Sequence, residues 1–181
     1  MSVISRSDTA IVIVDVQERL APAMHQTEWL VERTRTLAAI ANALNIPMLV
    51  TEQYPAGLGP TVPAIRDQLG DTPIFAKSSF SAFGSEDFVN QLEHLGRRTI
   101  ALAGIESHIC VLQTALDAID RGYQVHLVAD AVASRRGEDR SGALDRMSQA
   151  GISLSCVESV GFECLGAAGS DDFRAVARLI R

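Results

Sequence analysis

The stretch Thr99-Ile100-Ala101-Leu102-Ala103-Gly104-Ile105-Glu106-Ser107-His108-Ile109-Cys110 decides the fold of the chain. It reads as a short apolar strand, a turn at a glycine, and a helix that begins near the cysteine. The helix prediction rests on apolar residues that recur at the three- and four-residue spacing of one buried face. These residues are Ile109, Leu112, Ala115, Leu116 and Ile119. Cys110 would then lie in the first helical turn, beside unpaired backbone N–H groups.

A cysteine at the start of a helix has two interpretations. The positive end of the helix favours the thiolate, so Cys110 is a candidate nucleophile that loses its proton more readily than a free thiol. Free cysteines are also common as small apolar residues of the core. Position alone does not separate these interpretations, so the decision depends on residues elsewhere in the chain.

Composition predicts the class of protein. The chain has 181 residues, 47% hydrophobic and 21% charged, which is typical of a folded domain, and we expect one domain over residues 1–181. A net charge of −6 and scattered basic residues argue against nucleic acid as the main partner.

Cysteine usage and hydropathy predict the compartment. The three cysteines include no Cys-x-x-Cys pair and leave an odd one over, which favours a reducing environment. The first apolar run is too short for a secretory signal, and no stretch approaches the ~20 apolar residues of a membrane span. We therefore expect a cytoplasmic protein without a membrane partner.

Six short apolar runs alternate with helical patterns along the chain. The runs predicted as strands are residues 10–14, 48–51, 73–76, 99–103, 125–129 and 152–155. Such alternation is typical of an α/β protein in which helices cover both faces of a parallel sheet. We expect a Rossmann-like three-layer α/β/α fold, and the common strand order 3-2-1-4-5-6 would make the first and fourth strands neighbours.

Three chemically useful side chains follow the carboxyl ends of these strands. Asp15 follows the first strand, Lys77 the third, and Cys110 the fourth. Open α/β sheets place their sites at this edge. Each residue alone also fits an ordinary role, namely a turn or helix cap for Asp15, a surface lysine for Lys77 and a core residue for Cys110. Their convergence on one edge favours a functional site.

The three side chains together suit acyl transfer. Cys110 can attack a carbonyl carbon to form a thioester that water hydrolyses. Asp15 can take the thiol proton and return it to a leaving amine. Lys77 is a cation that would stabilise both the carboxylate and the thiolate, and backbone N–H groups at the helix start suit the oxyanion.

Three motifs resemble those of the isochorismatase-like cysteine hydrolases. They are Val14-Asp15-Val16-Gln17, Ala76-Lys77-Ser78-Ser79-Phe80-Ser81-Ala82-Phe83 and Gly104-Ile105-Glu106-Ser107-His108-Ile109-Cys110. The resemblance covers nearly the whole chain and implies a six-stranded parallel sheet with a catalytic triad of Asp15, Lys77 and Cys110. It also implies a cis peptide between Ile105 and Glu106, and an oxyanion hole made by the N–H groups of Glu106 and Cys110. Family members are commonly dimers or larger assemblies, so we expect a homo-oligomer.

The sequence departs from the nicotinamidase branch of that family. Nicotinamidases bind a metal through an Asp-x-His pair after the second strand, whereas this chain has Thr51-Glu52-Gln53-Tyr54-Pro55 there. Without imidazole or thiolate ligands a zinc site is not expected. We therefore predict an enzyme without metal or other cofactor. True isochorismatases generally lack the cysteine, so Cys110 points toward hydrolysis of a C–N bond in a small amide-like substrate.

Several other residues are candidates for the pocket. Candidate substrate-binding residues are Gln17, Tyr54, Phe80, Phe83 and His108, with core packing as the default interpretation for the two phenylalanines. Asp130 ends the fifth predicted strand and would either support the site or form a structural hydrogen bond. Cys156 and Cys164 are predicted to be buried and inert.

Three hypotheses for the function of the chain remain open. The first is a metal-independent cysteine hydrolase that acts through a thioester, with hydrolysis of another bond type as a variant. The second is a thiol sensor whose low-pKa cysteine is oxidised, although no resolving cysteine lies nearby. The third is a non-catalytic partner-binding protein that has kept the fold.

Overall fold

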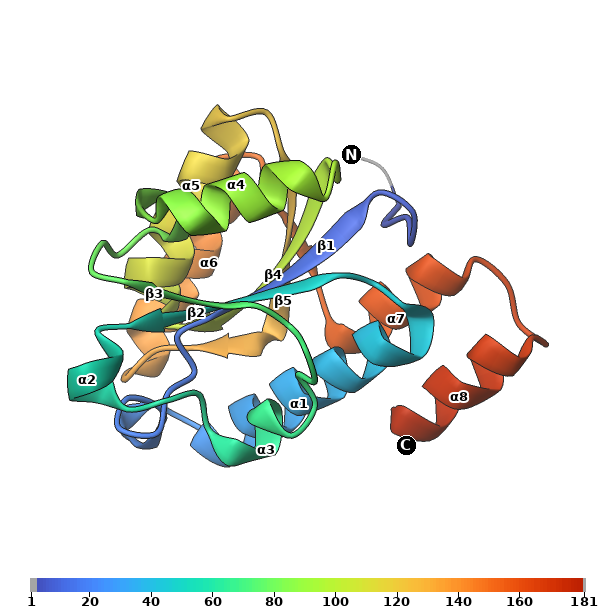
Figure 1. The fold of residues 1–181 in the computed structure, drawn as a ribbon, viewed down its shortest axis with the longest axis horizontal. Coiled ribbons are helices and arrows are strands. Elements are labelled where there is room, and N and C mark those ends of the chain that lie inside the picture. The colour runs from blue at the N-terminus through green and yellow to red at the C-terminus, as the bar shows by residue number, and fades with distance from the viewer. Residues whose placement is uncertain (1–2, 181) are drawn as a thin grey trace.

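The chain forms a twisted parallel sheet with helices on both faces (Figure 1). The computed structural model describes residues 3–180. The strands are β1 (Thr9–Val14), β2 (Met48–Gln53), β3 (Ile74–Lys77), β4 (Thr99–Ile105), β5 (Gln124–Ala133) and β6 (Ser153–Ser155). They are all parallel, in the order β3-β2-β1-β4-β5-β6. The predicted fold class and strand order are therefore confirmed.

The helices form one layer on each face of the sheet. The α-helices are α1 (Thr27–Leu44), α2 (Pro55–Leu58), α3 (Pro63–Arg66), α4 (Glu86–His94), α5 (Leu112–Asp120), α6 (Gly137–Gln149), α7 (Val157–Leu165) and α8 (Asp171–Leu179). Short turns η1 (Ala21–Ala23), η2 (Ala82–Gly84) and η3 (Ser107–Val111) complete the described elements. Helices α4, α5 and α6 lie on one face, and α1, α3, α7 and α8 lie on the other (Figure 1).

Alternating side chains of the central strand divide the core in two. Ile11 and Ile13 pack toward the α1 layer, whereas Val12 and Val14 pack toward the α4 layer. All four are fully buried, as expected for a parallel strand covered on both faces. This packing fixes the strand in the sheet and hence the position of the residue that follows it, Asp15.

Strand β4 approaches β1 unusually closely at Gly104. Gly104 has a φ of 119°, and a Cβ atom at this position would lie only 2.1 Å from the backbone oxygen of Val14. Only glycine therefore fits here. The two residues are also register partners, so this contact aligns the end of β1 with the end of β4.

The region around the cysteine differs from the predicted helix start. Cys110 lies within the π-helical turn η3, and the regular helix α5 begins only at Leu112. The fifth strand also differs, because β5 continues through Asp130 to Ala133 where the sequence pattern predicted an end at residue 129.

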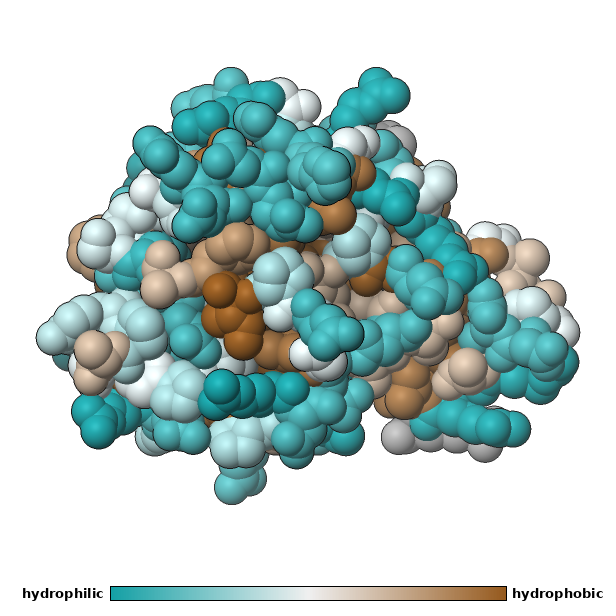
Figure 2. Space-filling model, viewed as in Figure 1, coloured by the Kyte–Doolittle hydropathy of each residue, from teal (hydrophilic) through white to brown (hydrophobic). Residues whose placement is uncertain are grey.

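One edge of the sheet reaches the surface at β3. Hydrophobic residues gather across the middle of the face shown in Figure 2, between the hydrophilic surfaces of the two helix layers. Ile74 of β3 is among the exposed hydrophobic residues of the chain.

Among the helices that the structure describes, none is long and apolar enough to cross a membrane.

Candidate active site

The carboxyl edge of the sheet brings together the ends of four strands. Val14 is the register partner of Thr51 in β2 and of Gly104 in β4, and Gln53 in β2 is the partner of Lys77 in β3. Residues that follow or end these strands therefore meet at one edge, although they are far apart in the sequence. Asp15, Lys77 and Cys110 all lie there.

Asp15 is buried and held by two donors. Its backbone has a φ of 54°, a left-handed conformation that aspartate tolerates better than most residues. The hydroxyl of Thr51 donates to Oδ1 at 2.7 Å, and Nζ of Lys77 donates to Oδ2 at 2.6 Å. Both carboxylate oxygens are thus fixed, which orients the group before any substrate arrives.

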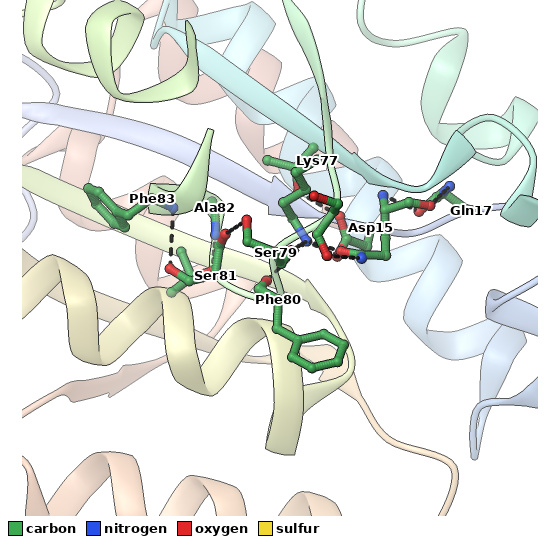
Figure 3. Close-up of polar contacts among 12 residues, drawn as sticks. Asp15, Gln17, Lys77, Ser79, Phe80, Ser81, Ala82 and Phe83 are labelled. Carbon is green, nitrogen blue, oxygen red and sulfur yellow. Dashed lines mark hydrogen bonds and ion pairs between the residues drawn. The ribbon is translucent and has the colours of Figure 1, made fainter. Parts of the chain in front are cut away.

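Lys77 is the only lysine of the chain, and its side chain is completely buried. Besides Asp15, its ammonium group donates to Oε1 of Gln53 at 2.7 Å and to the backbone oxygens of Ser79 at 3.2 Å and Phe80 at 3.0 Å. Figure 3 shows this side chain pointing toward Asp15. Such complete pairing offsets the cost of burying an ammonium ion.

The Cys110 thiol contacts the Asp15 carboxylate, and its pKa is raised above that of a free thiol. Burial, the negative charge of Asp15 and a hydrogen bond to that carboxylate raise the pKa of Cys110 to about 12. The positive charge of Lys77 and the backbone N–H of Glu106 oppose this rise in pKa without cancelling it. The predicted lowering of the pKa by a helix start is therefore wrong, because the thiol is buried, a carboxylate lies beside the sulfur and the regular helix begins only after Cys110.

The turn before the cysteine has an unusual backbone. The peptide bond between Ile105 and Glu106 is cis. Glu106 is 5% exposed, and its backbone oxygen accepts from the N–H groups of Ile109 and Val111. The Glu106 N–H is left to face the sulfur of Cys110.

Two of the candidate pocket residues make contacts within the protein framework. Gln17 is fully buried, and its side-chain amide bonds to the backbone of Gln53 and Gly59 at 2.7–2.9 Å, so it ties two loops together. Phe83 packs in the core, with its ring centroid 5.6 Å from that of Phe88. Figure 3 shows the Phe83 ring far from Asp15. The placement of Phe83 agrees with core packing, and contact of either residue with substrate stays a prediction.

The other three candidates lie around the edge of the sheet. Tyr54 and Phe80 are 64% and 54% exposed, and each neighbours Lys77 through a backbone hydrogen bond. His108 is half-buried, and its Nδ1 lies 2.9 Å from Oγ of Ser134. Contact of these three residues with substrate stays a prediction.

At the end of β2, in the stretch aligned with the metal-binding pair of nicotinamidases, Glu52 of this chain bonds to another part of the protein. Oε1 of Glu52 accepts from the N–H of Thr61 at 2.7 Å and from its hydroxyl at 2.8 Å. Over residues 3–180, no three His, Cys, Asp or Glu side chains gather in a way that could hold a metal ion.

The remaining sequence candidates have structural roles. Asp130 pairs with Arg33 at 2.9 Å and accepts the backbone N–H of Val157, so it joins β5 to α1 and α7. Cys164 is buried as predicted, and burial raises its pKa to about 11. Cys156 is only half-buried, contrary to prediction, because its sulfur caps the start of α7.

Sequence reasoning missed the residues that hold the triad in place. Thr51 donates a hydrogen bond to Asp15, and Gln53 accepts one from Lys77. Arg135 pairs with Glu106 at 3.2 Å. The position of Thr51 and Gln53 in the sequence could have indicated this role. Polar residues at the end of a buried strand that neighbours the strand before Asp15 lie at the same edge of the sheet as Asp15.

Comparison with known proteins identifies the family. The isochorismatase domain model matches residues 9–159. The chain belongs to the isochorismatase family. A secreted isochorismatase effector, Isc1 of Phytophthora sojae, is 39% identical over 173 residues, which cover 93% of this chain and 82% of the effector.

Solved structures of isochorismatase-family relatives share the whole fold. A structure described as MAR1 ribonuclease from Caenorhabditis elegans superposes with a TM-score of 0.94 at 38% identity, covering 99% of this chain and 92% of the other. The YcaC protein of Escherichia coli, described as an octameric hydrolase of unknown specificity, has a TM-score of 0.94 at 29% identity, with 99% and 90% covered. This chain therefore has an isochorismatase-family hydrolase fold.

The oligomeric state and the cellular location of this protein stay predictions. The YcaC protein is described as octameric, and the expectation that this protein forms a homo-oligomer stays a prediction. One relative is a secreted effector, so membership of the family does not assign a cytoplasmic location.

Proposed function

We propose that this protein is a metal-independent cysteine hydrolase that cleaves a C–N bond of a small amide-like substrate. The observation that carries the proposal is the contact between the Cys110 thiol and a carboxylate, Asp15, that is already paired with a buried ammonium group. A base, a nucleophile and a compensating cation in one buried cluster suit acyl transfer.

In the first half-reaction, Asp15 accepts the thiol proton as the sulfur attacks the substrate carbonyl carbon. The tetrahedral oxyanion is stabilised by the backbone N–H groups of Glu106 and Cys110. When this intermediate collapses, the C–N bond breaks and Asp15 returns the proton to the leaving amine. The acyl group stays on Cys110 as a thioester.

In the second half-reaction, water replaces the amine. Asp15 takes a proton from the water as its oxygen attacks the thioester carbon. The C–S bond then breaks, Asp15 returns that proton to the sulfur, and the carboxylic acid leaves. Throughout both half-reactions, the hydrogen bond from Lys77 keeps the Asp15 carboxylate in place.

A thiol-sensing function is less well supported. A redox sensor needs a low-pKa, accessible thiol. Here Cys110 is buried and its pKa is raised to about 12. A non-catalytic function predicts that Cys110→Ser retains full biological activity, whereas the hydrolase proposal predicts that it does not.

The proposal is tested by a screen for ammonia release from amide, carbamoyl and ureido compounds, with and without a chelator. We expect turnover that chelator leaves unchanged and that Cys110→Ala abolishes. The screen also includes RNA, because ribonuclease is the activity named for the nematode relative. Cleavage of RNA by both wild type and Cys110→Ala, without turnover of any amide, would contradict the proposal.

A further inference from the structure

The carboxylate of Glu106 has one oxygen that nothing in the described protein satisfies. Oε1 lies 3.2 Å from Nη2 of Arg135, whereas Oε2 is buried and has no hydrogen-bond partner. Within residues 3–180, the other buried side-chain atoms without a partner are the hydroxyl oxygens of Thr34, Ser107 and Ser155. Because an unsatisfied buried carboxylate oxygen is more costly than a hydroxyl, this one calls for a functional explanation.

The position of Glu106 supplies that explanation. Its backbone N–H donates to the sulfur of Cys110, so the carboxylate belongs to a residue that contacts the proposed nucleophile. The side chain of Glu106 is only 6% exposed, whereas that of Arg135 is 62% exposed. The ion pair therefore joins a group buried beside the cysteine to a group at the surface.

We propose that Oε2 of Glu106 is a specificity-determining atom that accepts a hydrogen bond from an N–H group of the substrate. The inference rests on the proposed function and narrows its substrate class. Substrates should carry an N–H on or next to the carbonyl carbon, as primary carboxamides and ureido compounds do. Esters and N,N-dialkyl amides offer only acceptors there, which a carboxylate repels.

Arg135 acts as a positioning residue in this arrangement. Its guanidinium holds Oε1, which leaves Oε2 as the oxygen available to the substrate.

Two small electrophiles test this proposal without knowledge of the natural substrate. 2-Chloroacetamide has an N–H donor, and N,N-dimethyl-2-chloroacetamide has none. In each case the sulfur of Cys110 forms a C–S bond, the C–Cl bond breaks, chloride leaves and the thiol proton passes to Asp15. The ratio of the two labelling rates is measured by mass spectrometry and divided by the same ratio for glutathione.

We expect wild type to favour the primary amide by about tenfold over the glutathione ratio, the size expected for one charge-assisted hydrogen bond. Glu106→Ala should lose this preference. Glu106→Gln should lower it by about threefold, because the glutamine is the same size but has no charge. Glu138→Ala removes an exposed glutamate of α6 and should leave the ratio unchanged.

The outcomes separate this inference from the proposed function. If neither reagent labels Cys110 in wild type, the proposed function fails and the inference fails with it. If both reagents label Cys110 at the glutathione ratio, only the inference is overturned. Should Glu106→Ala not fold, Glu106→Gln and Arg135→Ala decide the matter, and an unchanged ratio in both folded variants overturns the role of Glu106.

Discussion

The Nζ atom of Lys77 lies 2.6 Å from Oδ2 of Asp15, and neither side chain is exposed to solvent. A buried ion pair of this kind is expensive to form and still more expensive to break, because the remaining charge has no water to solvate it. Its presence beside a cysteine explains two properties together. The carboxylate is held in the orientation that the proposed role as a base requires, and its charge adds to the effect of burial in raising the pKa of the neighbouring thiol.

Loss of the ammonium group should destabilise the fold. We expect Lys77→Met to lower the free energy of unfolding by about 3–5 kcal/mol, because it leaves the Asp15 carboxylate buried without its cation. Urea denaturation measures this. Arg35→Ala breaks an exposed ion pair with Glu32 and should cost less than about 1 kcal/mol.

A double variant separates this explanation from simple loss of packing. Asp15→Asn combined with Lys77→Met should be less destabilised than the sum of the two single variants, because no unpaired charge remains. Strict additivity would show that the two groups do not interact.

The charge of Asp15 should set the protonation of Cys110. Asp15 raises the pKa of the thiol, so Asp15→Asn should lower that pKa below about 12 while Lys77 continues to favour the thiolate. Thiolate absorbance is titrated for each protein, and the curve of the matched Cys110→Ser protein is subtracted. In wild type we expect no Cys110 thiolate at pH 9, and in Asp15→Asn the signal should begin at lower pH. A wild-type midpoint below pH 8 would refute this account of the site.

The close approach of β4 to β1 should require glycine. Gly104→Ala would place a Cβ against the backbone of Val14, and we expect a loss of about 2–3 kcal/mol in the free energy of unfolding. Alkylation of Cys110 should change as well, since the ends of β1 and β4 carry the base and the nucleophile. Gly142→Ala is the control, because a Cβ there meets nothing within 4 Å in helix α6 and should stabilise by up to about 1 kcal/mol.

The single lysine should resist modification in the native protein. Lys77 has no exposed side-chain area, so an amine-selective acylating reagent should leave it unmodified until the chain is unfolded in urea. Peptide mapping before and after unfolding measures this directly. Rapid acylation of Lys77 under native conditions would mean that the ion pair opens readily to solvent.

The sheet was predictable from sequence because its signals are local and repeated. Each buried strand is a short apolar run bounded by turn residues, and the alternation with helices implies parallel order. The placement of Asp15, Lys77 and Cys110 at one edge followed from that topology. By contrast, the end of β5 was misplaced, because Asp130 looks like a strand terminus but continues the strand while bound to Arg33 and Val157.

The chemistry of the site was harder to predict because it depends on contacts between distant segments. The pKa of Cys110 was predicted from its position near a helix start, yet burial raises it, and so does a carboxylate that is 95 residues away in the sequence, from position 15 to position 110. Gln17 looked like a pocket residue because of its neighbours in the motif, and only the folded loops reveal that Gln53 and Gly59 occupy its amide.

The central claim is that the sulfur of Cys110 carries the acyl group during turnover. The most direct measurement is mass spectrometry of the protein quenched during reaction with an amide found in the ammonia-release screen, followed by peptide mapping. We expect an acyl adduct on the peptide that contains Cys110, lost on treatment with hydroxylamine and absent from Cys110→Ser. Undiminished turnover by Cys110→Ser, or an acyl adduct on another residue, would contradict the account.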